Sequence, residues 1–366
     1  MKQKNILFIA NRLDFGGAEA YVLSIANEIQ KRKYKVFVAS SGGKLVQQLE
    51  EGIKHFTIPA DAKKPLKILQ CSLMLRKIIN SNSINIVHTN SVITCLIAKI
   101  ASLGSKTIII NTAHSWGINK KPLSAKIVGF SADKVVAVSA STADSYIKNG
   151  LKKNKVLVVH NGIDTEKFQR INNEKILKIK NSLNIDPEKF IIINIARMEE
   201  ARKGHEVLLE SAKIVIEKYN NVHYLLLGDG YLRPGLENKV KNLNIARNIH
   251  FLGNRTDVVN LLSSSDIFCL PSDWEGLPLV IAEAMSCKLP IIATAVNGVP
   301  EIVVDNETGF LIKPRDPKVL SEKIIFLIEN PEVRAKMANN GYKRVNDHFS
   351  LKNLVNRLES IYSEYL

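Results

Sequence analysis

The sequence predicts an α/β protein built from two doubly wound parallel domains. Short apolar runs of strand length recur along the 366 residues, and longer amphipathic or charged stretches of helical character lie between them. The chain is long enough for two ordinary domains, and its 45% of hydrophobic residues is typical of a globular protein. A fresh set of strand and helix patterns begins at 190–196, so we expect an N-terminal domain over 1–164 and a C-terminal domain over 165–349.

The first half opens with a strand, a glycine turn and a helix. The apolar run 5–10 precedes Gly16-Gly17, and apolar residues from Val22 to Ile29 then recur at the i, i+3, i+4, i+7 spacing of one helical face. The amphipathic segment 63–80, with lysines near its ends, either packs on the sheet with a solvated outer face or contacts a membrane or a lipid diphosphate. Further strands are predicted at 36–40, 54–59, 84–89, 107–112, 134–139 and 155–160, and helices at 45–51 and 63–80.

The second half repeats this pattern without repeating residues. Strands are predicted at 190–196, 223–228, 249–252, 267–271, 290–294 and 309–312. Helices are predicted at 165–187, 206–217, 232–243, 256–263, 280–285 and 317–329, and 331–365 is expected to be helical to its end. Such alternation is typical of a doubly wound parallel domain.

Two carboxylates, Glu275 and Glu283, flank the predicted start of one of these helices. Seven residues separate them, and Pro278 between them is tolerated in a first helical turn, where its missing N–H would be unpaired anyway. A helix N-terminus has free N–H groups and attracts phosphate. A nucleotide diphosphate bound there could reach Glu275 with its sugar and Glu283 with its ribose, although two acids at this spacing are most often solvated helix positions.

The context of these acids carries a family resemblance. Glu283 is followed by Ala284-Met-Ser-Cys-Lys-Leu-Pro290 and by Gly298-Val-Pro-Glu301, and the whole stretch resembles the donor-site signature of the retaining GT-B glycosyltransferases of family 4, the glycosyl transferases group 1. The resemblance covers the whole chain. It implies two Rossmann-like domains facing across a cleft, an N-terminal one for the acceptor and a C-terminal one for a nucleotide-sugar donor. The last helix, 350–366, is expected to join the N-terminal domain.

Two positions in this stretch vary from the usual family pattern. Pro278 offers no N–H, so phosphate contacts are expected from Leu277, Leu279 or Val280. Lys288 stands where the family usually has a glycine, at a position after the helix that favours left-handed backbone.

A second group of candidate residues is basic. Arg197 and Lys203 follow a predicted strand with five residues between them, and a guanidinium with an ammonium could neutralise a leaving diphosphate. Cations in loops are usually just solvated. In the family that the chain resembles, however, Arg-x5-Lys-Gly at this position binds the diphosphate. The resemblance also implies that Gly253 and Arg255 lie near the base of the nucleotide.

The N-terminal half offers a glycine pair and a histidine. Gly16-Gly17 lies at a strand-to-helix turn, where backbone without a Cβ can approach a phosphate, but the pair could equally be a tight turn. A lone histidine is more often structural than catalytic, and both His88 and His114 lie at the ends of predicted strands. The resemblance favours His114, because the family has a histidine there that hydrogen-bonds a hydroxyl of the transferred sugar.

No metal or bound cofactor is expected. The sequence has no Asp-x-Asp motif, no P-loop and no closely paired cysteines, and a dinucleotide fingerprint starting at Gly228 fails because Arg233 stands at its third glycine. Arg197, Lys203 and the helix dipole would replace a cation, and the nucleotide sugar would be a co-substrate. The four scattered cysteines are typical of small buried residues in a reducing cytoplasm.

Positive charge is concentrated in the first half. Residues 1–164 carry 24 Lys and Arg against 9 Asp and Glu, whereas the rest of the chain carries 27 against 26. A one-sided basic domain usually has a polyanionic partner, and we favour an anionic membrane surface with its phosphate-bearing lipids. A nucleic-acid-binding protein is an alternative, but aromatic residues make up only 6% of the chain and none cluster with lysines in a recognisable motif.

With the resemblance, these observations predict a retaining, metal-independent, hexosyltransferase-type glycosyltransferase. It would move a sugar from a nucleotide-diphosphate sugar, with UDP favoured, to a lipid-linked glycan acceptor in the synthesis of capsule, lipopolysaccharide or other surface polysaccharide. A GT-B epimerase or phosphorylase acting on related sugars is the alternative. The opening apolar run is too short for a signal peptide or a membrane span, so we expect a cytoplasmic protein at the inner face of the cell membrane.

Overall fold

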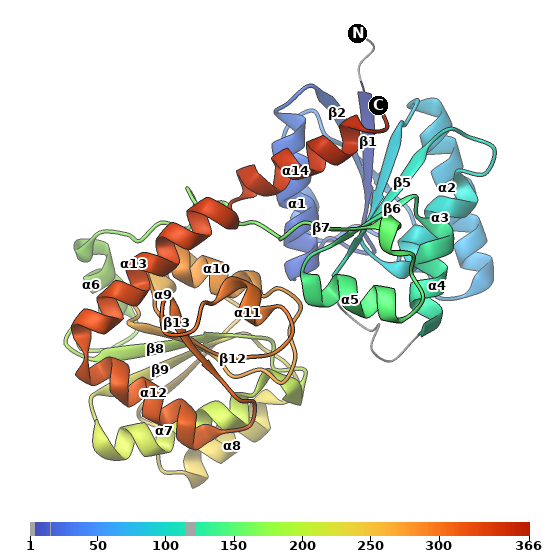
Figure 1. Ribbon diagram of the computed structural model, residues 1–366. Helices are drawn as coiled ribbons and strands as arrows, with labels where there is room; N and C mark the ends of the chain where they lie inside the picture. The colour runs from blue at the N-terminus through green and yellow to red at the C-terminus, as the bar shows by residue number, and fades with distance from the viewer. Residues whose placement is uncertain (1–3, 15, 115–121) are drawn as a thin grey trace. The chain divides into compact units, whose positions relative to one another are not determined.

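The computed structural model describes residues 4–14, 16–114 and 122–366. The chain divides into two compact units, unit 1 with residues 1–162 and 351–366, and unit 2 with residues 163–350. Each unit has one parallel sheet with helices on both faces, which confirms the prediction of two Rossmann-like domains (Figure 1). The predicted boundary after residue 164 lies two residues from the observed division.

The sheet of unit 1 has the strand order β3-β2-β1-β4-β5-β6-β7, and its strand pairs are parallel. Its strands are short apolar runs, as expected of parallel strands that are covered on both faces. Their bounds are β1 Lys4–Ile9, β2 Tyr34–Ser40, β3 Lys54–Thr57, β4 Ile86–Thr89, β5 Ile108–Ala113, β6 Lys134–Ala137 and β7 Val156–Val158.

Helices of unit 1 cover the two faces of this sheet unequally. One face carries α1 (Gly17–Gln30) and α14 (Leu351–Ser363), and the other carries α2 (Pro65–Ser81), α3 (Val92–Ala101), α4 (Pro122–Ser131) and α5 (Ala140–Lys148). Helix α14 comes from the end of the chain and packs beside α1, because Leu354, Leu358 and Tyr362 recur about one turn apart on its buried face.

The sheet of unit 2 has the strand order β10-β9-β8-β11-β12-β13, again with parallel pairs. Its strands are β8 Phe190–Ile195, β9 Val222–Leu227, β10 Ile249–Gly253, β11 Ile267–Leu270, β12 Ile291–Thr294 and β13 Gly309–Ile312. Its helices are α6 Asn173–Ser182, α7 His205–Lys218, α8 Arg233–Asn242, α9 Val258–Ser263, α10 Leu279–Ser286, α11 Val299–Ile302, α12 Pro317–Glu329 and α13 Pro331–His348. Helices α7, α8 and α12 cover one face, and α9 and α10 lie on the other (Figure 1).

Two predicted helices are wrong in extent. A helix over 45–51 does not form, and a 3-10 helix, Lys44–Gln48, takes its place after Gly43, whose φ of +137° turns the chain against the backbone of Leu13. The stretch 331–365 forms two helices, α13 and α14. They break at Phe349, which is buried and whose carbonyl oxygen accepts a hydrogen bond from the N–H of Ile163 over 2.9 Å.

Other helices also differ from the sequence patterns. The charged stretch 165–187 is helical only in α6, and α3, α4, α5 and α11 lie outside the predicted helical ranges. Helix α3 packs between α2 and α4 and is apolar on most sides, so it lacks the polar face that an amphipathic pattern requires.

Candidate functional site

Lys203 and Glu275 form an ion pair at the carboxyl end of the unit 2 sheet. Lys203 lies in the segment after β8 and Glu275 in the loop after β11, and these two strands are neighbours. Lys203 Nζ lies 2.7 Å from Glu275 Oε1, and the side chains are only 15% and 10% exposed. The pair therefore lies at the edge of the sheet where open α/β proteins bind ligands.

Ser272 is a second partner of the Glu275 carboxylate. Ser272 is fully buried, and its hydroxyl donates to Glu275 Oε1 over 2.7 Å. Both hydrogen bonds end on Oε1, whereas Oε2 accepts none among the described residues. Oε2 is therefore the oxygen that is available to a ligand.

The two loops that carry this pair are connected to each other. Gly204 has a left-handed φ of +72°, and a Cβ there would lie 2.0 Å from the carbonyl oxygen of Pro271, so only glycine fits. Arg202 donates to the carbonyl oxygen of Trp274 over 2.8 Å, and its guanidinium lies over the indole ring. These contacts fix the positions of Lys203 and Glu275 without a ligand.

Arg197 lies in the same loop as Lys203 but is much more exposed. Its side chain is 57% exposed, and its guanidinium is 3.8 Å from the carboxylate of Glu199. The backbone before Arg197 packs closely against Gly228, where a Cβ would lie 2.1 Å from the carbonyl oxygen of Ala196. The Gly228 segment thus supports the Arg197 loop, and Arg197 is a solvent-exposed cation near the buried pair.

Helix α10 begins four residues after Glu275. Pro278 is its N-cap, and no side chain of the described residues caps this end, so the first N–H groups have no intrahelical acceptor. Leu277 is buried, whereas Leu279 and Val280 of the first turn are half-buried. The predicted phosphate contacts therefore surround an uncapped helix N-terminus.

Glu283 lies in the second turn of α10 and is half-buried. Its side-chain carboxyl makes no hydrogen bond or ion pair with the described residues. Burial raises the pKa of its carboxyl to about 7, and the nearby charge of Lys167 opposes this rise. A carboxyl with a raised pKa and no protein partner is a candidate ligand-binding group.

The end of α10 confirms the predicted left-handed position. Lys288 has a φ of +58° directly after the C-cap Cys287. The N–H groups of Lys288 and Leu289 bond back to the carbonyl oxygens of Met285 and Ala284 over 2.9 and 3.0 Å. A lysine thus takes the conformation that a glycine usually provides at this position.

Gly253 and Arg255 lie at the end of β10, on the edge of the sheet. The carbonyl oxygen of Gly253 accepts a hydrogen bond from the N–H of Gly228 over 2.9 Å. Arg255 forms a two-pronged pair with Asp257 at 2.8 and 2.7 Å. Their predicted location near a nucleotide base stays a prediction.

In unit 1, Gly16 and Gly17 are the N-cap and the first residue of α1. Gly16 has an extended backbone that any residue can adopt, and a Cβ there would meet the side chain of Glu19 at 2.3 Å. A Cβ on Gly17 would meet nothing within 4 Å. Backbone conformation therefore does not require these glycines, and open space adjoins Gly17 at the helix N-terminus.

His114 directly follows β5. Its Nε2 lies 3.3 Å from Oδ1 of Asn90, and its ring packs edge-on against Tyr21 with 4.8 Å between ring centroids. Burial lowers the pKa of His114 to about 4. The imidazole is therefore neutral near pH 7 and can exchange hydrogen bonds with an uncharged hydroxyl.

His88, in contrast, has hydrogen-bond partners for both of its ring nitrogens inside unit 1. It is buried in β4, and its Nδ1 and Nε2 lie 2.5 Å from the Tyr362 hydroxyl and 2.6 Å from the Thr112 hydroxyl. Burial lowers its pKa to about 3. Thr112 in turn lies 3.0 Å from the hydroxyl of Tyr21. A chain of buried hydrogen bonds thus connects α14 with the ring that packs on His114.

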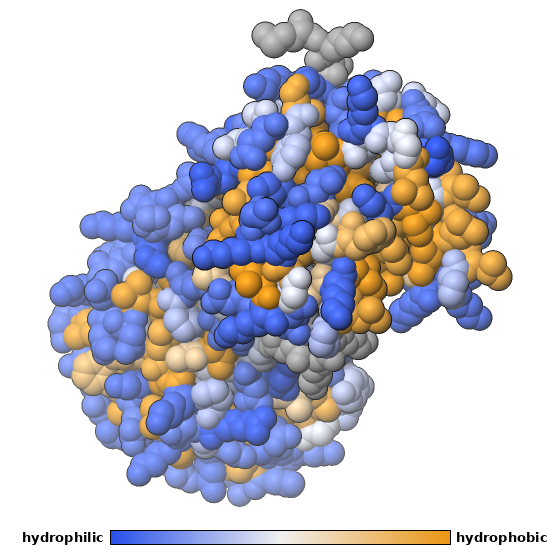
Figure 2. Space-filling view, turned by 45° about the vertical axis from the view of Figure 1, so that its right-hand side comes forward, coloured by the Kyte–Doolittle hydropathy of each residue, from blue (hydrophilic) through white to orange (hydrophobic). Residues whose placement is uncertain are grey.

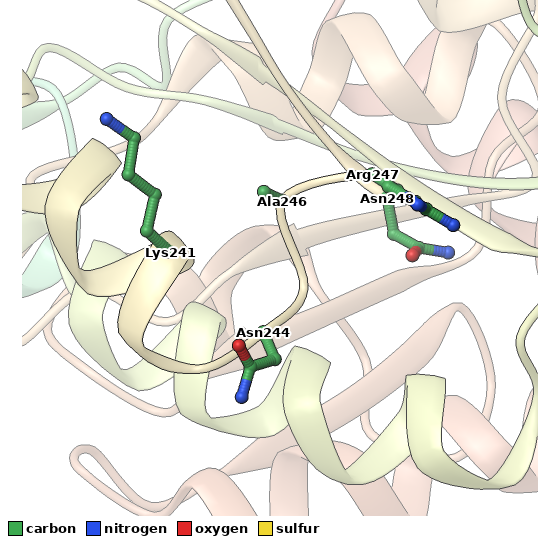
Figure 3. A pocket seen from close by; sticks show the side chains of 5 residues that line it. All are labelled: Lys241, Asn244, Ala246, Arg247 and Asn248. Atoms are coloured by element: carbon green, nitrogen blue, oxygen red, sulfur yellow. The ribbon is translucent and has the colours of Figure 1, made fainter.

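Surface hollows occur in both units. One in unit 1 is lined by Asn90, the partner of His114, together with Ala10, Asn11, Arg12, Ala18 and Glu19, and it adjoins the start of α1. One in unit 2 lies between the end of α8 and β10 and contains none of the predicted residues. Figure 3 shows its lining residues, Lys241, Asn244, Ala246, Arg247 and Asn248.

Metal-ligand clusters and membrane-spanning helices are two features that residues 4–14, 16–114 and 122–366 lack. Within these ranges no group of three or more His, Cys, Asp or Glu side chains is arranged to hold a metal ion. No helix in the same ranges combines the length and apolar character needed to cross a membrane. All four cysteines are buried free thiols.

Three residues around the candidate sites were not among the predicted site residues. Ser272 lies only three residues before Glu275, but no pattern in the surrounding sequence indicates that its hydroxyl binds the Glu275 carboxylate. Asn90 directly follows β4, so the rule that strand ends carry ligand-binding residues could have indicated it. Tyr21 lies on the buried face of α1 and has no pattern that separates it from the core.

Comparisons with known proteins agree with this architecture. The family model described as "Glycosyl transferases group 1" matches residues 175–344, and the one described as "Glycosyltransferase Family 4" matches residues 15–167. A capsular polysaccharide biosynthesis glycosyltransferase, CapM of Staphylococcus aureus, is 30% identical over 92% of this chain and 92% of its own length. The UDP-Gal:alpha-D-GlcNAc-diphosphoundecaprenol alpha-1,3-galactosyltransferase of Escherichia coli is 28% identical over 89% of this chain and 87% of its own.

Solved structures share the fold. A glycosyltransferase from Rickettsia africae superimposes with a TM-score of 0.87 and 24% identity, covering 100% of this chain and 99% of its own. Anabaena Alr3699/HepE in complex with UDP and glucose also has a TM-score of 0.87, with 21% identity over 98% and 99% of the two chains. The chain therefore belongs to the glycosyl transferases group 1, glycosyltransferase family 4, and its two Rossmann-like units are those of a GT-B glycosyltransferase.

Proposed function

We propose that this protein is a retaining hexosyltransferase that moves a sugar from a UDP-sugar to a lipid-linked glycan acceptor in the synthesis of a bacterial surface polysaccharide such as capsule or lipopolysaccharide. The Staphylococcus aureus relative is named for capsular polysaccharide biosynthesis. The name of the Escherichia coli relative includes a UDP-Gal donor and a diphosphoundecaprenol-linked acceptor. The Anabaena structure contains UDP and glucose. These names support the proposed classes of donor and acceptor.

The Lys203–Glu275 pair is the observation that carries the proposal. Glu275 has Oε2 available, and Lys203 has three N–H donors of which Glu275 occupies one. A nucleotide sugar bound beside the pair would find an acceptor for its sugar hydroxyls next to a cation for its phosphate. We assign the sugar hydroxyls to Glu275 and the departing diphosphate to Lys203 and Arg197.

The rest of the donor is assigned to α10 and β10. The carboxylate of Glu283 would accept hydrogen bonds from the ribose hydroxyls. N–H groups at the start of α10 would bind phosphate through the helix dipole. The base would lie near Gly253 and Arg255.

The proposed reaction retains the configuration of the anomeric carbon. The bond between this carbon and the departing phosphate oxygen breaks, and the acceptor oxygen forms its bond on the same face. The proton of the acceptor hydroxyl passes to the departing phosphate oxygen. Arg197, Lys203 and the helix dipole stabilise the developing charge in place of a metal ion.

In unit 1 we assign phosphate contacts to Gly16 and Gly17 and a sugar hydroxyl to His114. The excess of cations in residues 1–164 suits a diphosphate-bearing lipid acceptor and an anionic membrane. We therefore propose that the protein works as a peripheral protein at the cytoplasmic face of the cell membrane.

A donor screen followed by a transfer assay tests the function. Because a ligand that binds only the folded state raises the melting temperature, thermal shifts with UDP-, GDP- and ADP-sugars identify the donor. That donor is then incubated with an undecaprenyl-diphosphate-linked sugar in the presence of EDTA, and NMR reads the product's anomeric configuration. We expect transfer with retention. An inverted product would overturn retention, and activity that EDTA abolishes and Mg²⁺ restores would overturn metal independence.

Leaving out the acceptor separates the alternative reactions. An epimerase would convert the nucleotide sugar with no acceptor present. A phosphorylase would require inorganic phosphate and would act without the nucleotide. The proposed transferase should leave the nucleotide sugar largely unchanged in the first incubation and should release no sugar phosphate in the second.

A further inference from the structure

Two helices of unit 1 carry large apolar side chains on their solvent sides. On α2, Leu66 is 82% exposed and Leu73 is 55% exposed. On α4, Leu123 is 66% exposed and Phe130 is 72% exposed. A helix that packs on a sheet normally has polar residues on its outer side, so these four side chains indicate a surface that is covered by a partner.

The exposed leucines of α2 form a stripe. At about 100° per residue, Leu66 and Leu73 project within about 20° of each other. Leu75, a buried residue, projects about 180° from Leu66 by the same rule. Leu69, also exposed, lies between Leu66 and Leu73 along the helix and projects about 60° from Leu66. Helix α2 therefore has two apolar sides, one in the core and one in solvent.

Helix α4 repeats this arrangement. Leu123 and Phe130 have the same seven-residue spacing, and exposed Lys126 lies between them. Helix α3 packs against both α2 and α4, so both stripes belong to one layer of unit 1. Figure 2 shows hydrophobic side chains gathered over this part of unit 1 with hydrophilic ones among them. We define the α2–α4 face by its exposed apolar residues Leu66, Leu69, Leu73, Met74, Leu123 and Phe130.

Only positive charges are interspersed with these residues along the chain. Residues 62–132, which contain α2, α3 and α4, include ten Lys and Arg and no Asp or Glu. The ammonium of Lys99 lies 5.8 Å from the ring centroid of Phe130. Exposed cations of this segment include Lys63, Lys64, Lys67, Arg76, Lys77, Lys106 and Lys126. The partner of the α2–α4 face must therefore offer both an apolar phase and negative charge.

An anionic lipid bilayer meets both requirements. Leucine and phenylalanine side chains can enter the acyl region, while lysines extend to the headgroup phosphates. A second copy of the chain would bring the same cations against each other, which opposes face-to-face pairing. A nucleic acid would neutralise the lysines but leave the leucines in water.

We propose that the α2–α4 face docks on an anionic membrane, with Leu66, Leu73 and Phe130 inserted among the lipids. The choice of a membrane as the partner rests on the proposed function. The docking proposal adds a defined surface, whose apolar side chains contribute to binding. Vesicle binding needs neither donor nor acceptor, so docking and catalysis can fail separately.

Co-sedimentation with vesicles tests the proposal. The wild type should sediment with vesicles of phosphatidylethanolamine and phosphatidylglycerol, and not with pure phosphatidylcholine. Part of the binding should persist in about 1 M NaCl, where the Debye length is only about 3 Å. The triple variant L66Q/L73Q/F130Q should lose this salt-resistant part. The triple variant K63Q/K64Q/K67Q should weaken binding at low salt by about 100-fold.

Matched variants on unit 2 control for apolar area and charge. Leu177, Ile214 and Phe326 are also exposed, so L177Q/I214Q/F326Q should bind vesicles as the wild type does. K175Q/K318Q/K336Q removes the same charge from unit 2 and should also leave binding unchanged. Melting temperatures verify that each variant is folded.

Two results would overturn the docking proposal. One is equal salt-resistant binding by L66Q/L73Q/F130Q and the wild type. The other is a dimer on gel filtration that these three substitutions abolish, since the face would then be an interface between two copies. Glu275→Gln separates docking from the proposed function, because it should abolish transfer and leave vesicle binding intact. A wild type that transfers sugar but does not bind vesicles would refute docking alone.

Discussion

Lys203 Nζ donates to Glu275 Oε1 over 2.7 Å, although the two residues are 72 positions apart in the chain. Because the pair is mostly buried, each charge depends on the other for its stabilisation. The predicted sugar-binding carboxylate and one predicted phosphate-binding cation therefore contact each other directly, with no ligand between them. The other predicted cation, Arg197, is exposed, so the two cations should respond differently to substitution.

Lys203→Ala is expected to lower both stability and turnover. Unfolding free energy should fall by about 3–5 kcal/mol in urea titrations, because Glu275 is left buried without its cation. Turnover should fall by about 10²–10³-fold and donor affinity much less, since the ammonium acts most strongly on the departing diphosphate. Arg197→Ala is the control for stability and should change it by less than about 0.5 kcal/mol. Unchanged turnover in folded Lys203→Ala would rule out a catalytic role.

Ser272→Ala tests whether the second hydrogen bond positions Glu275. Loss of this buried donor should cost about 1–3 kcal/mol of stability and weaken binding of the UDP-sugar by about tenfold. Binding of UDP alone should not change, because UDP lacks the sugar that Glu275 would hold. Calorimetry with both ligands measures the difference. Ser272→Thr keeps the hydroxyl and should restore sugar recognition, whereas equal weakening of both ligands would indicate a general structural defect.

Glu283 should make stability depend on pH. Burial raises the pKa of its carboxyl from 4.5 to about 7, so the folded state disfavours the ionised form. The contribution of Glu283 to the unfolding free energy is therefore full below about pH 4.5 and is lost as the pH rises through about 7. Glu283→Gln removes this loss and should stabilise the protein at pH 8 by about 3 kcal/mol, with no gain at pH 4. Melting curves across this range test the sign, and a gain that is largest at pH 4 would contradict it.

The same titration should affect donor binding. Ribose hydroxyls donate more strongly to an ionised carboxylate, so UDP affinity should increase between pH 6 and pH 8 in the wild type. Glu283→Gln should remove the part of this increase that comes from Glu283. Any pH dependence from the ligand's own phosphates remains in the variant, which makes it the matched control. Identical pH profiles would show that Glu283 does not bind the ribose.

Gly17→Ala separates a ligand contact from a folding role. A Cβ there meets nothing within 4 Å, and alanine is favoured over glycine in a helix, so the melting temperature should stay the same or rise. Donor affinity should fall about tenfold if phosphate approaches this backbone closely. Gly235→Ala is the control, because Gly235 lies in the first turn of α8 and also has open space around it. Wild-type donor binding by Gly17→Ala would contradict the predicted contact.

Tyr362→Phe should weaken the packing of α14 against the rest of unit 1. It leaves His88 Nδ1 buried without its partner, which should cost about 1–3 kcal/mol. Hydrogen exchange should then become faster in α14 and remain unchanged in unit 2. Tyr365→Phe removes a hydroxyl near the same chain end without touching His88 and should leave the exchange of α14 unchanged.

The positions of the strands could be predicted from sequence because each is an apolar run bounded by polar or turn residues. The apolar repeat of α1 and the signals around Pro278 similarly identify α1 and α10. Lys288 could be predicted to be left-handed because it stands where the family usually has a glycine, directly after a helix. These features depend on residues close together in the chain.

Longer-range features were harder to predict. Helix α3 has no amphipathic pattern because it is buried on most sides and lacks a polar face, and the break at Phe349 depends on a hydrogen bond from Ile163, which is far along the chain. His88 and His114 have similar sequence settings, yet His88 has both ring nitrogens hydrogen-bonded inside unit 1, whereas His114 contacts Asn90, which lines a surface hollow.

The sequence by itself determined the fold class, the family and the residues that form the candidate donor site, because these depend on local patterns and motifs. The tertiary structure decided how those residues act on one another. Strands β8 and β11 are neighbours in the sheet, and only this pairing brings Lys203 to the oxygen of Glu275 that also accepts from Ser272. Burial, which no motif encodes, then makes that contact strong and raises the pKa of Glu283.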